Sequence, residues 1–300
     1  NTTSAFERIL TGIERERERE IIARRFGLHD RKETLEQIGD LLGITRERVR
    51  QLEKAILIRL KLAAEKDTDN VGAVEKHFIR HLHEMGGAAR VSDLTKRIHT
   101  SPNERDHAHV AFIAELAPNL TVLGENDNYH HGVAIRERHD EKKLRGDVDS
   151  VVRTIKEHGQ PISVTDLHAK LSHEHPDQVR AIASLSKNLS SLKDQWGLNK
   201  WPTVNPKNIR DKIYVILQDN GKPMHFSEIA SSIKGSEFKR KNVTTQAIHN
   251  ELIKDKRFVL IGRGIYALSE WGYRKGTVSD IIADILRKEG APLTRDEIVR

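Results

Sequence analysis

Apolar positions in the first part of the chain follow the spacing of α-helices. Residues 7–25 are densely charged, but their apolar residues fall on one face of a predicted helix, which Phe26-Gly27-Leu28 interrupts. The apolar residues of this N-terminal stripe are Ile9, Leu10, Ile13, Ile21, Ile22 and Phe26. A short three-helix unit cannot easily hide the whole stripe, so we expect part of it to stay exposed and to hold a protein partner.

Two more helices are predicted after this stripe. Thr34, followed three residues later by Gln37, predicts the N-cap of a helix over Leu35–Leu42, which a glycine ends. Thr45 can cap a longer basic helix over residues 46–62. A helix, a tight glycine-containing turn and a longer basic helix together predict a helix-turn-helix.

The last of these helices has two different faces. At about 100° per residue, its apolar residues gather on one side and can pack, whereas its polar residues share an arc of about 140° on the other side. Arginine can pair with guanine, glutamine with adenine and glutamate with cytosine in the major groove. Periodicity alone leaves open that this face is merely solvated. The candidate DNA contacts of the region are Thr34, Leu35, Thr45, Arg46, Glu47, Arg48, Arg50, Gln51 and Lys54.

The rest of the chain contains an internal repeat. In four segments a helix ends at glycine, a short extended stretch follows, and a capped second helix begins. The matching glycines are 72, 62 and 69 residues apart, which is about one small domain each. These glycines are Gly87, Gly159, Gly221 and Gly290.

The third copy of the repeat has the clearest pattern. It predicts helices over residues 209–217, 226–233 and 244–253, followed by a hairpin whose Gly-Arg-Gly turn separates alternating apolar residues. Three helices with such a hairpin predict a winged helix. Its candidate phosphate contacts are Lys239, Arg240, Lys241 and Arg263, although a solvated surface fits the pattern equally well.

The predicted fold class is mainly α, with an N-terminal helix-turn-helix followed by tandem winged-helix domains of three helices and a β-hairpin wing each. The predicted domains are residues 1–66, 71–137, 146–206, 207–275 and 277–300, the last being the start of a truncated fourth repeat. Residues 67–70 and 139–145 are the predicted linkers. Because the chain begins with Asn and stops within a predicted helix, we expect a fragment of a longer protein.

Composition narrows the class of partner. The chain has 51 Lys and Arg against 44 Asp and Glu, and the net charge of +7 favours polyanions, above all nucleic acid. No signal peptide and no apolar run of about 18 residues is present, so we expect a cytoplasmic protein. The absence of cysteine excludes disulfides, thiolate catalysis and cysteine-based metal sites.

Histidine is abundant, with 16 residues, but a metal site is not predicted. His77 and His81 have helical i, i+4 spacing and His83 is close, yet no His-Glu-x-x-His motif accompanies them and the other histidines are scattered. The sequence contains no phosphate-cradling loop and no recognisable nucleophile constellation. We therefore predict neither a cofactor nor enzyme activity.

Three N-terminal segments carry a resemblance to a known family. The residues REREIIARRFGL (17–28), TLEQIG (34–39) and GITRERVRQLE (43–53) closely resemble regions 4.1 and 4.2 of primary-type sigma factors, over roughly residues 6–62. The resemblance implies that Arg46, Glu47, Arg50 and Gln51 read the promoter −35 element. It also implies that the first helices dock on the flap of core RNA polymerase, through Ile9, Ile13, Ile21, Ile22 and Phe26.

The chain departs from the sigma pattern in two ways. Lys54 precedes Ala55 where the family has alanine and then lysine, which puts the phosphate contact at Lys54 in doubt. Nothing in the chain resembles the aromatic-rich region that melts the −10 element, and aromatic residues are only 5% of the total, so this chain is not a complete sigma factor.

A second resemblance concerns the third repeat. The stretch FVLIGRGIYALSEW (258–271) resembles the HARE-type winged helix, which is found in the delta subunit of bacterial RNA polymerase, in chromatin factors and beside restriction nucleases. Domains of this type are proposed to bind DNA or proteins, so the resemblance leaves both open.

We predict a sequence-specific DNA-binding transcription factor that recognises a promoter element and associates with RNA polymerase. Two alternatives remain. The chain could be an accessory, delta-like subunit whose winged helices bind polymerase or another protein, or the DNA-targeting part of a restriction or modification system.

Overall fold

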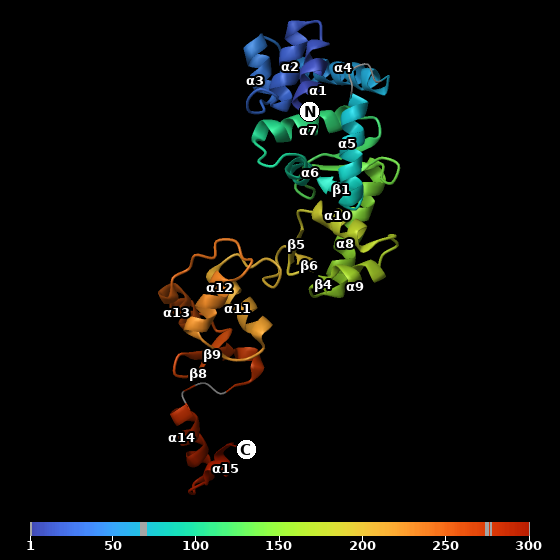
Figure 1. The fold of residues 1–300 in the computed structure, drawn as a ribbon. Coiled ribbons are helices and arrows are strands. Elements are labelled where there is room, and N and C mark those ends of the chain that lie inside the picture. The colour runs from blue at the N-terminus through green and yellow to red at the C-terminus, as the bar shows by residue number, and fades with distance from the viewer. Residues whose placement is uncertain (1, 67–70, 274–275, 277, 300) are drawn as a thin grey trace. The chain divides into compact units, whose positions relative to one another are not determined.

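The computed structural model describes residues 2–66, 71–273, 276 and 278–299. The predicted linker at residues 67–70 lies outside the described residues. The chain forms two compact units, Asn1–Leu189 and Ser190–Arg300. Figure 1 shows both units and labels their helices and most of their strands.

The N-terminal region consists of helices α1 (Thr2–Thr11), α2 (Glu16–Phe26), α3 (Leu35–Leu42) and α4 (Arg46–Glu65). The prediction of one helix over residues 7–25 is wrong, because the chain turns between α1 and α2. The Arg19 guanidinium fixes this turn by donating two hydrogen bonds, of 3.2 and 2.8 Å, to the carbonyl of Ile13. The predicted helix over Leu35–Leu42 is confirmed, and α4 extends one turn beyond the predicted residue 62.

The chain then follows the order helix, strand, helix, helix, strand, strand three times. The first repeat has α5 (Val71–Glu84), β1 (Ala88–Arg90), α6 (Val91–Ile98), α7 (Glu104–Leu116), β2 (Leu120–Leu123) and β3 (Gly132–Ile135). The second has α8 (Glu141–His158), β4 (Ile162–Ser163), α9 (Val164–Ala169), α10 (Pro176–Ser184), β5 (Leu189–Leu192) and β6 (Gln195–Leu198). The third has α11 (Ile209–Asn220), β7 (Met224–His225), α12 (Phe226–Lys234), α13 (Thr245–Lys254), β8 (Phe258–Gly262) and β9 (Ile265–Leu268).

The first and third repeats build the same small antiparallel sheet. Its strand order is β1-β3-β2 in the first repeat and β7-β9-β8 in the third, so the last strand lies in the middle. Val122 is paired with Val133 in the first sheet and Val259 with Ala267 in the third. The turn η1 (Ser269–Trp271) follows the third sheet, and α14 (Val278–Glu289) and α15 (Arg295–Val299) come last.

The predicted linker at residues 139–145 instead contains the N-cap and the first turn of α8. The Asp140 side chain caps this helix by accepting a hydrogen bond of 2.7 Å from the backbone N–H of Lys143. His139 is buried, and its Nδ1 lies 3.0 Å from the Asp147 carboxylate. A capped helix start with a buried side chain is a packed element rather than a linker.

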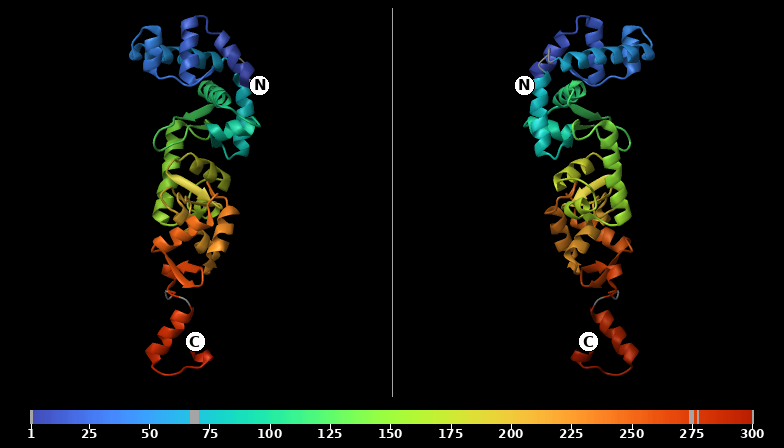
Figure 2. Two further views of the ribbon diagram at one scale, coloured as in Figure 1. Left: turned by 90° about the vertical axis from the view of Figure 1, so that its left-hand side faces the viewer. Right: turned by 90° about the vertical axis from the view of Figure 1, so that its right-hand side faces the viewer.

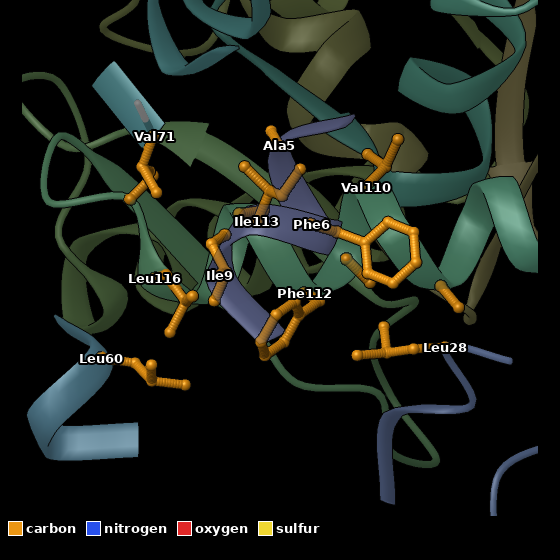
Figure 3. Packing of buried hydrophobic residues seen from close by; sticks show 14 of the residues in the cluster. Ala5, Phe6, Ile9, Leu28, Leu60, Val71, Val110, Phe112, Ile113 and Leu116 are labelled. Atoms are coloured by element: carbon orange, nitrogen blue, oxygen red, sulfur yellow. The ribbon is translucent and has the colours of Figure 1, made fainter. Parts of the chain in front are cut away.

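One hydrophobic core joins the four N-terminal helices to the first repeat. It runs without interruption from Ala5 in α1 to Ile135 in β3. Figure 3 shows Phe6 and Ile9 of α1 among Phe112, Ile113 and Leu116 of α7. The views in Figure 2 show the green helix α7 directly against the N-terminal helices.

The expectation that part of the N-terminal stripe stays exposed is therefore wrong. Ile9, Ile21 and Ile22 are at most 1% exposed, and Leu10 and Ile13 are also buried. Phe26 is partly buried and packs on Phe112 of α7 with ring centroids 5.1 Å apart. There are two reasons: α7, whose residues from Ala108 to Leu116 are mostly apolar and buried, packs against α1 and Phe26 as well as its own repeat, and α2, which carries Ile21 and Ile22, packs against α3 and α4.

The first and second repeats are also joined closely, through backbone groups. The N–H of His130 donates to the carbonyl of Leu185 and the N–H of Lys187 to that of Asn128, each at 2.8 Å. A Cβ at Gly86 would collide with the carbonyl of Asp177 in α10, and Gly86 has a φ of 96°. Only glycine fits this close approach of two chain segments.

The third repeat has a hydrophobic core of its own in the second unit. It is built from α11, α12, α13 and the strands β8 and β9, with Leu192 packed against its edge. Arg257 ties the sheet to α11 by ion pairs with Asp255 at 2.8 Å and with Asp211 at 3.2 Å. Nowhere in the described residues is there a helix long and apolar enough to span a membrane.

Candidate nucleic-acid interface

The turn between α3 and α4 is fixed by two helix caps. The Thr34 hydroxyl accepts from the N–H of Gln37 at 3.1 Å, and the Gln37 side chain accepts from the N–H of Thr34 at 2.9 Å. The Thr45 hydroxyl accepts from the N–H of Arg48 at 3.1 Å and starts α4. These bonds are a capping box and an N-cap, which satisfy backbone donors at the two helix starts.

Glycine makes the turn itself tight. Gly43 ends α3 with a φ of 65°, a left-handed conformation that favours glycine. The N–H of Ile44 then donates to the carbonyl of Gly39 at 3.0 Å, and a Cβ at Gly39 would lie 2.7 Å from the carbonyl oxygen of Ile44. The close approach of the turn to α3 sets the angle between α3 and α4.

The inner face of α4 packs on α2 and α3. Val49 and Ile56 are buried, as the apolar arc predicts. Two ion pairs hold α4 against α2 beside this apolar contact, Arg25 with Glu53 at 3.3 Å and Arg59 with Glu18 at 2.5 Å. Glu53 therefore belongs to the packing face of α4 and not to its outer face.

The outer face of α4 is open over its first half. Arg46, Glu47, Arg48, Arg50, Gln51 and Lys54 are exposed, and Thr34 and Thr45 are exposed beside them. Leu35 differs, because its side chain packs against the core and only its backbone is left for a phosphate. The structure thus brings eight of the nine predicted side chains to the surface around the turn.

Glu47 and Arg50 pair with each other on this face. The Arg50 guanidinium donates to both Glu47 oxygens, at 2.9 and 2.7 Å. The hydrogen bond from Arg50 lowers the pKa of Glu47, and the same bond raises the pKa of Arg50. Both side chains are exposed, so the pair is weak and can open when another partner arrives.

Arg31 and Lys32 are exposed cations that the sequence reasoning missed. They lie in the loop before α3, close to its N-cap Thr34. Helix N-termini and neighbouring cations favour phosphate. Two adjacent basic residues just before an N-cap are the sequence signal that could have identified them.

The predicted contacts of the third repeat lie in the second unit. Lys239, Arg240 and Lys241 are exposed in the loop between α12 and α13. Arg263 is exposed in the turn between β8 and β9. These four residues belong to one repeat and form a group separate from that on α4.

The histidines do not assemble a metal site in the part of the chain that the structure describes, where no group of three or more potential ligands is found. His77 and His81 contact each other edge to face, with ring centroids 4.6 Å apart. His109 is buried, and its Nε2 lies 3.0 Å from the carbonyl oxygen of Leu28. This histidine serves packing between α7 and the loop after α2.

Together, α3, the tight turn and α4 form a helix-turn-helix with an open second helix. Residues 15–62 match the family model described as Sigma-70, region 4. The matched segment contains α2, α3 and most of α4, and with them all of the α4 side chains named above.

Similarity to individual proteins extends over short segments of the chain. The chain is 54% identical over 46 residues to the RNA polymerase principal sigma factor HrdC of Streptomyces coelicolor, which is 15% of this chain and 14% of that protein. It is 42% identical over 65 residues to the RNA polymerase sigma factor SigA1 of Synechococcus elongatus, or 21% and 15% of the two chains. The RNA polymerase sigma factor sigB of Arabidopsis thaliana is 48% identical over 46 residues, or 15% and 8%.

The chain thus spans only 8–15% of the length of these relatives. No solved structure matches it. The family match at residues 15–62 covers the helix-turn-helix together with α2.

Proposed function

We propose that this chain is a DNA-binding transcription factor that recognises a promoter element of the −35 type through α4. The observation that carries the proposal is the joint occurrence of the Sigma-70, region 4 match at residues 15–62 and an open, polar outer face on α4 within that match. Relatives that match the chain over 65 and 46 residues are named as sigma factors of RNA polymerase.

The geometry supports entry of α4 into the major groove. Its first half carries Arg50 and Gln51 on the exposed face, and such side chains pair with guanine and adenine edges. The N-terminus of α3, with Thr34 and the neighbouring Arg31 and Lys32, supplies groups that bind phosphate. Opening of the exposed Glu47–Arg50 pair would free one acceptor and one bidentate donor for bases.

Association with RNA polymerase is the second part of the proposal, and it rests on the printed names of the relatives. A contact between the N-terminal stripe and the polymerase flap does not fit this structure, because Ile9 and Ile13 are buried in the core shared with the first repeat. We therefore propose that polymerase contacts other surfaces of residues 2–66. Exposed apolar residues there are Leu41, Ile58 and Leu62.

We further propose that the three repeats are winged helices, with the domain boundaries 71–137, 146–206 and 207–275 and the beginning of a fourth at 277–300. The recurring element order and the sheets with the last strand in the middle support this. A non-enzymatic, cytoplasmic protein is part of the same proposal, since the function described needs only binding.

Selection of duplexes from a random pool by the full chain, with and without core RNA polymerase, tests the proposal. We expect enrichment of one short motif, sharpened or strengthened by polymerase. A matched selection with the Arg50→Ala, Gln51→Ala double variant should lose the motif. A wild-type chain that enriches no motif under either condition would contradict the proposed function.

A further inference from the structure

The basic excess of the whole chain lies in the third repeat. Residues 207–275 contain 14 Lys and Arg and 7 Asp and Glu. Their net charge of +7 is the same as that of all 300 residues. The remaining residues hold 37 of each sign and are neutral overall. Long-range attraction to a polyanion is therefore concentrated in this repeat.

Six of the seven acidic residues of this repeat, all except Glu237, are engaged in hydrogen bonds or ion pairs away from the basic loop. Asp211 and Asp255 pair with Arg257, and Glu228 accepts a hydrogen bond from the N–H of His225 at the start of α12. Lys239, Arg240, Lys241 and Arg263 form no ion pair within the described residues. The basic loop and the turn of the hairpin thus keep their charge available.

The first two repeats use their third helices for packing. In the first, α7 is buried between the N-terminal helices and its own repeat. In the second, α10 packs against β1, and its exposed Asp177 and Arg180 pair with each other at 2.9 Å. Neither helix presents an open face comparable with that of α4.

The third helix of the third repeat, α13, has such an open face. Ile248 and Leu252 point into the core, whereas Gln246 and Asn250 are exposed one turn apart, with Ile253 beside them at 64% exposure. Amide side chains can pair with adenine, and an apolar side chain can contact the thymine methyl group.

The hairpin turn and the basic loop are fixed relative to α13. The carbonyl of Gly264 accepts from the N–H of Phe226 at 3.0 Å, and the Phe226 ring contacts His249 of α13 with centroids 5.3 Å apart. On the other side, the buried Lys212 donates from Nζ to the carbonyl of Arg240 at 2.9 Å. Arg240 has a φ of 54°, so Lys212 holds a left-handed turn within the basic loop.

We propose that residues 207–275 form a second binding surface for duplex DNA, with α13 toward the groove and Lys239, Lys241 and Arg263 on phosphates. This surface is independent of α4, and the first two repeats serve as packing elements rather than DNA readers. Lys212 is a positioning residue, since it acts through the carbonyl of Arg240.

The salt dependence of binding to a random-sequence duplex tests this inference. Fluorescence anisotropy of a labelled duplex is measured with the full chain between 50 and 200 mM salt. Each phosphate contact contributes about 0.9 to the slope of log K against log salt, so the Lys239→Ala, Arg263→Ala double variant should lower the slope by about 1.8. The control variant Lys207→Ala, Lys222→Ala removes two exposed charges at the ends of α11 and should leave the slope unchanged.

The same titration in an Arg50→Ala, Gln51→Ala background separates this inference from the proposed function. In this background, DNA binding should remain salt-dependent and should weaken when Lys239→Ala and Arg263→Ala are added. That result supports a second DNA surface whether or not α4 binds DNA. Equal slopes for the wild type, the test variant and the control, with tryptophan fluorescence showing a folded second unit, would overturn the inference. If the Lys239→Ala, Arg263→Ala variant lost binding of a labelled polyglutamate but kept its DNA binding unchanged, the surface would be assigned to acidic proteins. That result would overturn the inference as well.

Discussion

Phe6 on α1 stacks on the imidazole of His109 on α7, with ring centroids 3.8 Å apart. His109 also lies within hydrogen-bonding distance of the carbonyl of Leu28, so one side chain joins α1, the loop after α2 and the first repeat. The Lys61–Glu115 pair, at 3.1 Å, adds a contact between α4 and α7. The helix-turn-helix is therefore built into the first unit and is not an appended module.

This shared core predicts that shortening Ile9 destabilises the first unit. Ile9→Ala should lower its free energy of unfolding by about 2–5 kcal/mol, because the side chain is fully buried. The three tryptophans, Trp196, Trp201 and Trp271, all lie in the second unit. The urea transition seen by far-UV circular dichroism should shift, while the one seen by tryptophan fluorescence should not.

The exposed Ile58 provides the control for this experiment. Ile58→Ala removes the same atoms from the surface of α4, where Ile58 is 51% exposed, and should cost much less. Equal shifts for the two variants would show that α1 is not packed as described.

Substitution by alanine should have opposite effects at two helical glycines, one beside the turn of the helix-turn-helix and one in open space on α8. Gly39→Ala should destabilise the first unit by about 1–3 kcal/mol, because the new Cβ would press on the carbonyl of Ile44. Gly146→Ala, within α8 and with open space around its Cβ, should stabilise it by about 0.5–1 kcal/mol. Thermal melts of the two variants by circular dichroism measure both effects, and stabilisation by Gly39→Ala would contradict the tight turn.

Buried histidines predict that the first unit loses stability in mild acid. Burial of His109 and partial burial of His131 lower the pKa values of both side chains below the ordinary value, so the folded state keeps them neutral while the unfolded state binds protons. Stability is therefore full above the unfolded pKa of about 6.5 and decreases as pH falls below it. Urea midpoints by circular dichroism should fall from pH 7.5 to 5.5, less steeply in His109→Gln. A midpoint independent of pH would contradict the burial of these rings.

The separate core of the third repeat predicts an independent folding unit. A chain of residues 207–275 should give a dispersed amide NMR spectrum, because Ile213, Ile248 and Phe258 pack within the repeat. Residues 190–275 should be more stable, since Leu192 covers the edge of that core. Random-coil dispersion for both chains would refute this.

Local signals made much of the fold predictable. Thr34 with Gln37, and Gly43 after them, defined α3 by short-range capping, and the hairpin at residues 257–268 followed from alternation around a glycine turn. The predicted arc of α4 was confirmed for the same reason, because a helix face depends only on sequence spacing.

Long-range packing explains what the sequence reasoning missed. The break between α1 and α2 depends on hydrogen bonds from Arg19, and no proline marks it. The cover over α1 comes from α7, which lies more than 90 residues further along the chain. The sequence of α7 carried a signal for this contact, since a helix that is apolar on most sides must be buried between two layers.

The most direct test of the central claim compares a selected DNA site with a random duplex, for the full chain and for Arg50→Ala and Gln51→Ala singly. If these side chains read bases, each variant should lose about 1–3 kcal/mol on the selected site and much less on the random duplex. Arg15→Ala, which removes an exposed arginine before α2, is the matched control and should change neither affinity. Equal losses on both duplexes would show that α4 contacts phosphate only and would contradict promoter recognition by this helix.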